Sequence, residues 1–133
     1  MNRKLNTNPA GFTLVEIMVV VAIVGLLATL AIPSYLRSRK RSEATQVLED
    51  LRLIDSAVDQ YSLEFSKVRG SDVEWADIQK YLKDASRLYA SGGADIFGNV
   101  IAIPSVDGVP KVPAATFAAL SDVAPAAFWS PYK

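Results

Sequence analysis

The hydrophobic residues of this chain are concentrated near its N-terminal end. From Phe12 to Ile32, 21 residues are almost all apolar, and Glu16 is the one charged residue among them. As a helix this segment would be about 31 Å long, which is close to the roughly 30 Å hydrocarbon core of a bilayer. The pattern therefore predicts a helix of membrane-spanning length over residues 12–33.

A second pattern begins after Pro33, where apolar positions recur every three or four residues. These positions are Ala44, Val47, Leu51, Ile54, Val58, Tyr61 and Phe65. The spacing is typical of an amphipathic helix with one buried stripe, and we expect this half of the helix to cover residues 34–68, with Gly70 after its end. Three heptads are few for a coiled coil, so we expect the stripe to pack on the chain's own C-terminal part.

The remaining residues, 69–133, predict a small head of short elements. Ser71 to Glu74 has the pattern of a capping box that opens a helix, and another helix is expected at 114–120. Three short segments are candidate strands: residues 87–90, 100–103 and 109–112. The fold class is therefore α+β, in which a long N-terminal helix packs by its second half on a small antiparallel sheet with short helices.

The composition excludes most catalytic chemistry. The chain has 14 basic and 14 acidic residues and contains neither histidine nor cysteine. These absences exclude a Cys/His zinc site, a cysteine nucleophile, a Ser-His-Asp relay and a disulfide. The balanced charge argues against nucleic-acid binding, and we find no carboxylate pair that the pattern places in a pocket. We therefore expect neither an enzyme nor a nucleic-acid partner.

Glu16 is the unusual residue of the apolar segment. An acidic side chain inside a membrane helix is costly unless it has a partner. Arg3 and Lys4 are not at helical spacing to neutralise it, so we expect the partner to come from elsewhere. A cut before Phe12 would create an α-amino group, and that ammonium on a neighbouring copy could pair with Glu16. From hydropathy alone, two other interpretations of the apolar segment stay open: an uncleaved membrane anchor, and a signal peptide cleaved before Ile32.

The residues Gly11-Phe12-Thr13-Leu14-Val15-Glu16, followed by an apolar run that ends at Pro33, resemble the N-terminal signature of type IV pilins and of the pseudopilins of type II secretion. The resemblance implies a leader over residues 1–11, cleavage between Gly11 and Phe12 by prepilin peptidase, and N-methylation of Phe12. It also implies that Glu16 serves assembly by pairing with the N-terminus of an adjacent subunit. Gly25 and Pro33 are then helix breakers, around which the helix partly melts in filaments.

The same resemblance implies partners and a location. The subunit would polymerise with itself and with minor pilins or pseudopilins, and would meet prepilin peptidase, an inner-membrane assembly platform and the lipid bilayer. It would cross the bacterial inner membrane once, with a cytoplasmic N-terminus and a periplasmic head, before entering a periplasmic or surface filament. Four basic residues that follow the apolar run, Arg37, Arg39, Lys40 and Arg41, oppose this orientation by the positive-inside rule. We follow the motif, and expect this cluster to face anionic headgroups or acidic neighbours.

Residues 95–100 loosely resemble the Asp-Pro-aromatic-Gly-Asn-Pro-Tyr loop of major pseudopilins, with Ile96 and Val100 where prolines are expected. In that family the region binds calcium. The oxygen donors here would be Asp95, Asn99, Ser105 and Asp107, which are fewer than the six to eight that calcium prefers. We favour the interpretation that Asp95 and Asn99 are turn residues, and expect no cofactor, with calcium as the alternative.

Three functions remain open at this point. The small cysteine-free head and the loop at residues 95–100 slightly favour a type II secretion pseudopilin. A type IV pilus subunit for adhesion, motility or DNA uptake is the second. A membrane-anchored binding module that never polymerises is the third, and it would not need Glu16.

Overall fold

The computed structural model describes residues 11–133, so residues 1–10 of the expected leader lie outside the described part. The elements in chain order are α1 (Leu14–Glu64), α2 (Trp75–Ile78), η1 (Gln79–Tyr81), α3 (Arg87–Ala90), α4 (Ala114–Leu120) and η2 (Ala126–Trp129). The chain forms two compact units, one up to Leu36 and one from Arg37 to Lys133, and α1 contributes to both. The predicted long helix and the predicted helix at 114–120 are confirmed.

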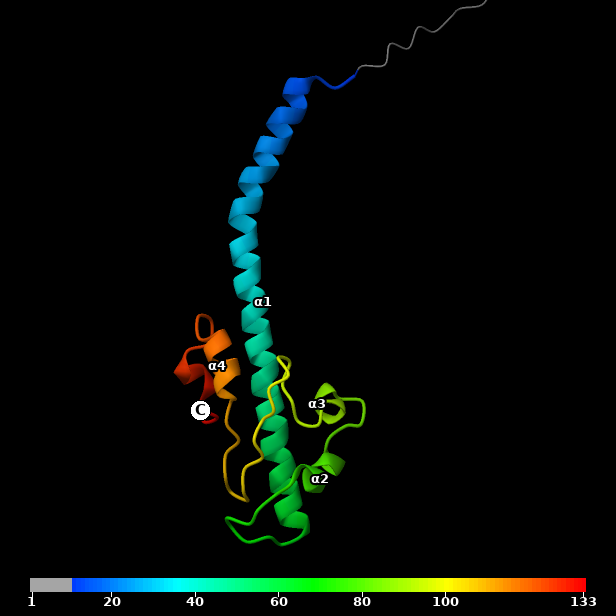
Figure 1. Ribbon diagram of the computed structural model, residues 1–133, viewed down its shortest axis with the longest axis vertical. Coiled ribbons are helices and arrows are strands. Elements are labelled where there is room, and N and C mark those ends of the chain that lie inside the picture. Colours follow the sequence, from blue (N-terminus) through cyan, green and yellow to red (C-terminus); the bar gives the residue numbers. More distant parts are fainter. Residues whose placement is uncertain (1–10) are drawn as a thin grey trace, which may run out of the picture. The chain divides into compact units, whose positions relative to one another are not determined.

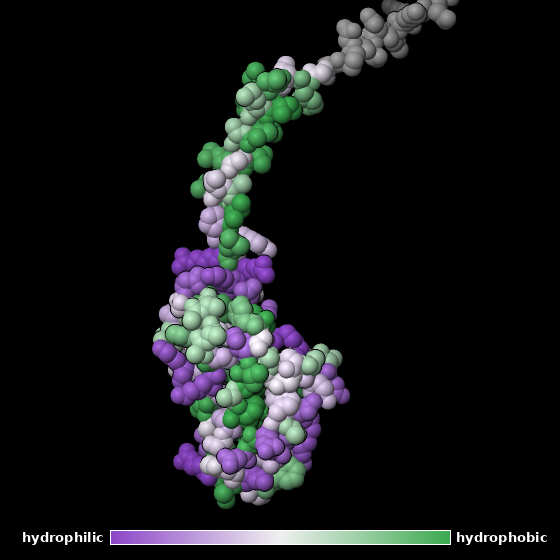
Figure 2. Space-filling model, viewed as in Figure 1, coloured by the Kyte–Doolittle hydropathy of each residue, from purple (hydrophilic) through white to green (hydrophobic). Residues whose placement is uncertain are grey.

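The N-terminal unit is the apolar part of α1. No residue from 11 to 43 is buried. Figure 2 shows hydrophobic residues at the surface along the visible face of this part of the helix. The helix is long and apolar enough to cross a membrane. An apolar surface of this extent is stable only when lipid or another apolar surface covers it.

The two predicted helix breakers do not interrupt α1 in this structure. Gly25 and Pro33 both lie within the continuous helix. A Cβ added at Gly25 would meet no atom within 4 Å, so close packing does not require the glycine. Pro33 has no amide proton to donate to the carbonyl of Thr29, which weakens the helix at this turn. The two positions therefore remain intrinsic weak points of a helix that is intact.

The head is built around the second half of α1. Figure 1 shows α4 and the C-terminal residues on one side of this helix and α2 and α3 on the other. The buried residues of α1 are Ala44, Val47, Leu48, Asp50, Leu51, Ile54, Ala57, Val58 and Tyr61. They pack with later residues that include Ile78, Leu88, Ile101, Leu120 and Trp129. The prediction that the stripe packs on the chain's own C-terminal part is confirmed, except that Phe65 is 51% exposed.

An ion pair joins α3 to the long helix. The Arg87 guanidinium donates a hydrogen bond to the carboxylate of Asp50, and another to the backbone carbonyl of Ala94 at 3.0 Å. Asp50 is buried and Arg87 is partly exposed. The contact fixes α3 against α1 and gives a buried carboxylate the partner that it needs.

Helix α1 ends earlier than expected. The Lys67 amide donates to the Ser62 carbonyl at 2.9 Å, across five residues, and Ser66 has a positive φ of 48°. This arrangement is a Schellman motif, in which the residue after the helix adopts the left-handed conformation. Ser66 therefore ends the helix, a role that the sequence predicts for Gly70. Gly70 lies further along, in the loop, where it has a positive φ of 81°.

Two local predictions for the head are wrong. Helix α2 starts after Glu74, whose amide donates to the Asp77 carboxylate at 3.0 Å, so the cap lies three residues later than the one predicted from Ser71. Residues 87–90 form the helical turn α3 rather than a strand. The Ser86 hydroxyl accepts a hydrogen bond from the Tyr89 amide at 3.2 Å, and this cap favours a helical turn.

The predicted antiparallel sheet stays unconfirmed. Within residues 11–133 no strand is assigned, and Ala94 and Val100 form one isolated antiparallel bridge. Two more backbone hydrogen bonds join the loop after α1 to a later loop, from Gly70 to Val106 and from Val106 to Ser71, both at 3.0 Å. The short helices around α1 are therefore connected by paired loops in the described part of the chain.

Candidate functional site

The expected cleavage site lies just before helix α1. Residues 11–13 are not helical and are exposed, and the Phe12 side chain is 84% exposed. Gly11 has open space around its Cα. The peptide bond between Gly11 and Phe12 is thus outside the hydrogen-bonded part of the helix, and an enzyme could reach it without unwinding α1.

Glu16 has a partner within its own chain. Its carboxylate accepts hydrogen bonds from the Thr13 amide and from the Thr13 hydroxyl, both at 2.8 Å. The Glu16 amide lies 3.2 Å from the same hydroxyl oxygen. This is a capping box, which satisfies free amide groups in the first turn of α1. Thr13 supplies hydrogen bonds but no opposite charge, so the expectation that a positively charged partner of Glu16 comes from elsewhere stays a prediction.

The sequence contained a signal for this contact. Thr-x-x-Glu before an apolar helix is the pattern of a capping box, and here it is Thr13 to Glu16.

A hollow of about 340 Å³ lies around this capping box, in the same unit of the chain. It is lined by Phe12, Val15, Glu16, Ile17, Val19 and Val20. An acidic group at the edge of an apolar hollow is suited to an apolar partner that carries one positive charge.

The second candidate site is the loop at residues 95–99. Asp95 is buried, with 3% of its surface exposed. One carboxylate oxygen accepts hydrogen bonds from the amides of Phe97 and Asn99, both at 2.9 Å, and the other accepts one from the hydroxyl of Thr116. The Asn99 side-chain amide donates to the same hydroxyl at 2.9 Å. The Asp95 side chain thus has the turn-forming contacts that the sequence favours, whereas the Asn99 side chain contacts Thr116 and not the backbone of the turn.

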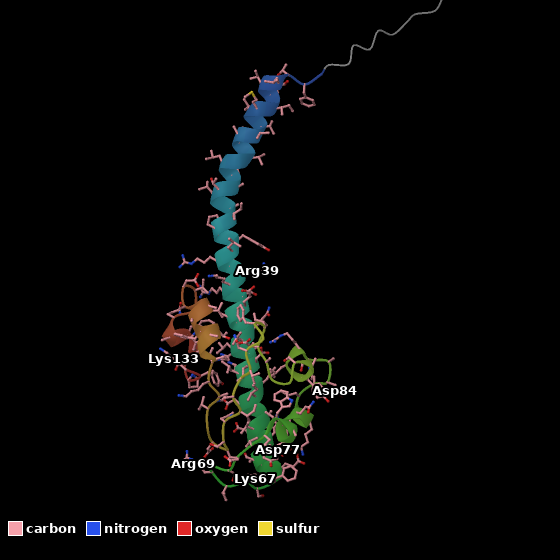
Figure 3. The ribbon with its side chains drawn as sticks, in the orientation of Figure 1. Arg39, Lys67, Arg69, Asp77, Asp84 and Lys133 are labelled. Atoms are coloured by element: carbon pink, nitrogen blue, oxygen red, sulfur yellow. The ribbon has the colours of Figure 1, made fainter. Side chains whose placement is uncertain are left out.

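The other two candidate calcium ligands have different partners. The Asp107 carboxylate pairs with the Arg69 guanidinium at 2.8 Å. Figure 3 shows Arg69 in the loop that follows α1. The Ser105 backbone carbonyl accepts a hydrogen bond from the Gly108 amide at 2.7 Å. No group of three or more acidic side chains that could hold a metal ion is found in residues 11–133. The Asp95 carboxylate already accepts three hydrogen bonds, from Phe97, Asn99 and Thr116. Calcium binding by Asp95, Asn99, Ser105 and Asp107 therefore stays a prediction, and these contacts do not favour it.

A protein-family model matches the N-terminal segment. Residues 6–32 match the prokaryotic N-terminal methylation motif. No solved structure matches the chain.

Curated relatives match a larger part. The type II secretion system core protein G of Klebsiella michiganensis is 40% identical over 57 residues, which are 43% of this chain and 40% of that protein. Core protein G of Vibrio cholerae is 33% identical over 84 residues, or 62% of this chain and 58% of that protein. The type IV major fimbrial protein FimA of Dichelobacter nodosus is 32% identical over 92 residues, or 69% of this chain and 54% of that protein.

The aligned segments span less than two thirds of the length of these relatives. The family model covers the residues Gly11 to Glu16, which carry the resemblance, and the relatives are pseudopilins and a fimbrial protein. The predicted resemblance is confirmed: the chain carries the N-terminal methylation motif and is related to type II secretion pseudopilins and to type IV fimbrial protein.

Proposed function

We propose that this protein is a structural subunit of a type IV pilus-like filament. The observation that carries the proposal is an N-terminal methylation motif at the start of a helix whose apolar segment is long enough to span a membrane and contains no buried residue. Lipid covers such a helix while the subunit waits in the membrane. Neighbouring copies cover it in a filament, where burial of apolar surface supplies most of the cohesion.

Processing prepares the subunit for assembly. Prepilin peptidase would cut between Gly11 and Phe12, in the exposed segment before α1, and Phe12 would then be N-methylated. The cut removes the leader and leaves an ammonium group at Phe12, two residues before Leu14, where α1 begins. A mature subunit would then present both a positive N-terminus and the negative Glu16.

Glu16 would exchange partners during assembly. In the single chain it accepts hydrogen bonds from Thr13, which is neutral. The ammonium of an adjacent subunit would bring an opposite charge, so the contact would gain the attraction between two ions that the neutral Thr13 donors do not supply. The exchange favours a neighbour whose N-terminus lies opposite Glu16 and disfavours other registers. Glu16 would therefore select the position of the incoming subunit.

A type II secretion pseudopilin is the first candidate among such filaments. Core protein G of two genera matches at 33–40% identity, and the composition and contacts of the head suggest a structural rather than a catalytic role. The subunit would then sit in the bacterial inner membrane with its head in the periplasm. It would polymerise with itself and with minor pseudopilins on an inner-membrane assembly platform.

A type IV pilus subunit is the second candidate. The alignment with a type IV major fimbrial protein covers a larger share of this chain, 69% against 43% for the first core protein G. Labelling of intact cells separates the two candidates. Surface filaments that contain the chain would identify a pilus, whereas a chain confined to the periplasm would identify a pseudopilus.

The first test is intact mass and N-terminal sequencing of the protein from its native membrane. We expect a chain that begins at Phe12 and is heavier by one methyl group. A chain that begins at Met1 would identify a plain anchor, and one that begins at Ile32 a secreted protein. Either result would contradict the filament proposal.

The second test addresses Glu16. We expect Glu16→Ala and Glu16→Val to leave membrane insertion and cleavage intact and to reduce assembly, because the incoming N-terminus loses its partner. Glu49→Gln is the matched control, since Glu49 is an exposed carboxylate of α1 beyond the apolar segment. Normal filaments from the Glu16 variants, or an equal defect in Glu49→Gln, would contradict the role of Glu16.

A further inference from the structure

We propose that the basic segment of α1, defined as Arg37, Arg39, Lys40 and Arg41, binds the phosphate groups of anionic phospholipids at the membrane face where the apolar helix ends. The proposal rests on membrane insertion of the apolar segment, which is part of the proposed function. It assigns a lipid-binding role to residues that the assembly function does not use.

The basic segment is a dense patch of exposed charge. It places four cations in five consecutive positions, all of them helical and exposed. Arg37 and Arg41 are one helical turn apart, about 6 Å along the axis. Figure 2 shows strongly hydrophilic residues at this place, and Figure 3 shows Arg39 at the same level of α1. Cations this close together repel one another unless anions lie between them.

The chain supplies few of those anions. Arg39 pairs with Glu43 at 3.0 Å and Lys40 with Asp122 at 2.8 Å, while Arg37 and Arg41 take part in no ion pair among residues 11–133. Both existing pairs are exposed, and exposed ion pairs contribute little stability. At least two cations are therefore available to an outside anion, and the paired ones can be shared with it.

The position along the chain favours a lipid surface. Arg37 follows Ile32, the last residue of the apolar run, by five residues. Five residues span at most about 18 Å when fully extended and about 8 Å when helical. Headgroup layers are roughly 5–8 Å thick on each side of the hydrocarbon core, and charges interact over about 8 Å at physiological salt. In the helical conformation of α1, Arg37 is thus within reach of the headgroups.

The directions of the side chains favour lipid over an acidic protein surface. Successive helical residues are rotated by about 100°, so Arg37 and Arg39 point about 200° apart, to opposite sides of α1. A single protein partner would contact one side of the helix, whereas a headgroup layer surrounds it. Three of the four cations are arginines, whose planar guanidinium binds phosphate through two parallel hydrogen bonds. Tyr35, 68% exposed, is an aromatic residue of the kind enriched at membrane interfaces.

The test measures which lipid the full chain retains. The protein is reconstituted in vesicles of equal parts phosphatidylglycerol and phosphatidylcholine, extracted in mild detergent, and the retained lipids are quantified by native mass spectrometry. We expect enrichment of phosphatidylglycerol, which decreases as salt rises. In the Arg37→Gln/Arg41→Gln double variant the enrichment should fall by up to about fivefold for each arginine. The Arg37→Lys/Arg41→Lys variant should keep most of it.

The matched control is Lys83→Gln/Lys111→Gln, which removes the same charge from exposed lysines of the head. It should retain phosphatidylglycerol as the unaltered chain does. Equal enrichment in the Arg37→Gln/Arg41→Gln variant, or an equal loss in the control, would overturn the proposal. So would an arginine variant that retains phosphatidylglycerol but fails to assemble, because that result assigns the basic segment to a protein neighbour. Failure of the unaltered chain to insert into vesicles would instead overturn the proposed function itself.

Discussion

The hydroxyl of Thr116 donates a hydrogen bond to the carboxylate of Asp95, 21 residues earlier in the chain. Thr116 is fully buried and lies in α4, while Asp95 is buried in the loop that follows α3. The contact joins two parts of the head that share no backbone pairing at these residues. Because buried carboxylates need partners, this hydrogen bond fixes the loop against α4.

Removing the hydroxyl should destabilise the head. In Thr116→Val the shape of the side chain is kept, but Asp95 loses its hydrogen bond from α4 and Asn99 loses its acceptor. We expect the free energy of unfolding to fall by about 1–3 kcal/mol. Urea titration of the full chain in detergent, followed by the fluorescence of its two tryptophans, Trp75 and the buried Trp129, measures it. Thr45→Val makes the same change at an exposed position and should cost less than about 0.5 kcal/mol.

Calcium should leave the stability of the head unchanged. The carboxylate of Asp95 already accepts hydrogen bonds on both oxygens, and Asp107 pairs with Arg69. A ligand that binds only the folded state raises its stability as its concentration rises. We therefore expect the same urea midpoint in calcium and in a chelator. A midpoint that rises steadily with calcium concentration would contradict this prediction and support a calcium site.

Two neighbouring leucines of α1 should differ sharply in their effect on stability. Leu51 is fully buried in the core of the head, whereas Leu53 is 46% exposed. Leu51→Ala should lower the free energy of unfolding by about 2–5 kcal/mol, because it removes buried methyl groups and leaves a cavity. Leu53→Ala should cost less than about 1 kcal/mol. Similar losses in the two variants would show that α1 packs on the head in another rotation.

The stability of the head should depend on pH through Asp50. Burial raises the pKa of Asp50, although the Arg87 guanidinium acts in the opposite direction. A carboxyl whose pKa is higher in the folded state favours folding when protonated, so its contribution is lost as pH rises from the ordinary value of 3.8 to the folded pKa. Asp50→Asn should make the fall in stability over this window smaller. Arg87→Gln should raise the pKa further and steepen the fall.

These two variants are compared by urea titration of the full chain at a series of pH values from about 3 to 7, the range in which carboxyl groups titrate. Burial also raises the pKa of Asp55, so part of the fall should persist in Asp50→Asn. Identical slopes in the unaltered chain and in both variants would contradict the assignment.

The Thr13 cap should control fraying at the start of α1. Thr13→Val removes the hydroxyl that contacts both the carboxylate and the amide of Glu16. Loss of a cap costs about 1 kcal/mol, so amide hydrogen exchange at Glu16 should become roughly fivefold faster. Thr29→Val is the control, because the Thr29 hydroxyl contacts the Leu26 carbonyl elsewhere in the helix. Unchanged exchange in Thr13→Val would show that the cap does not hold this turn.

The features that the sequence predicts correctly depend on neighbouring residues. The apolar run and the spacing from Ala44 to Tyr61 are repeated signals, and they identify the long helix and its buried stripe. Residues 114–120 have a uniform composition rich in alanine, and they form α4. The motif from Gly11 to Glu16 is equally local, which is why the resemblance could be found without a structure.

The features that the sequence does not predict depend on longer contacts or on competition between weak signals. Nothing in the spacing of Asp95 and Thr116 indicates that they meet, because α4 is brought to the loop by the core. Residues 87–90 are too short for their strand tendency to outweigh the Ser86 cap and the ion pair of Arg87 with Asp50. Ser66 ends α1 in a conformation for which glycine is the usual signal.

Burial along α1 begins only at Ala44. Bending or local unwinding between Leu14 and Glu43, including at Gly25 and Pro33, therefore breaks no buried contact of the head. The N-terminal half can therefore act as a compliant tether that bends without disturbing the buried core of the head. A substitution that stiffens the tether, such as Gly25→Ala, would then change how far the N-terminal half of α1 extends. A substitution that strengthens the head would change the thermal stability of the head, and the two effects would be independent.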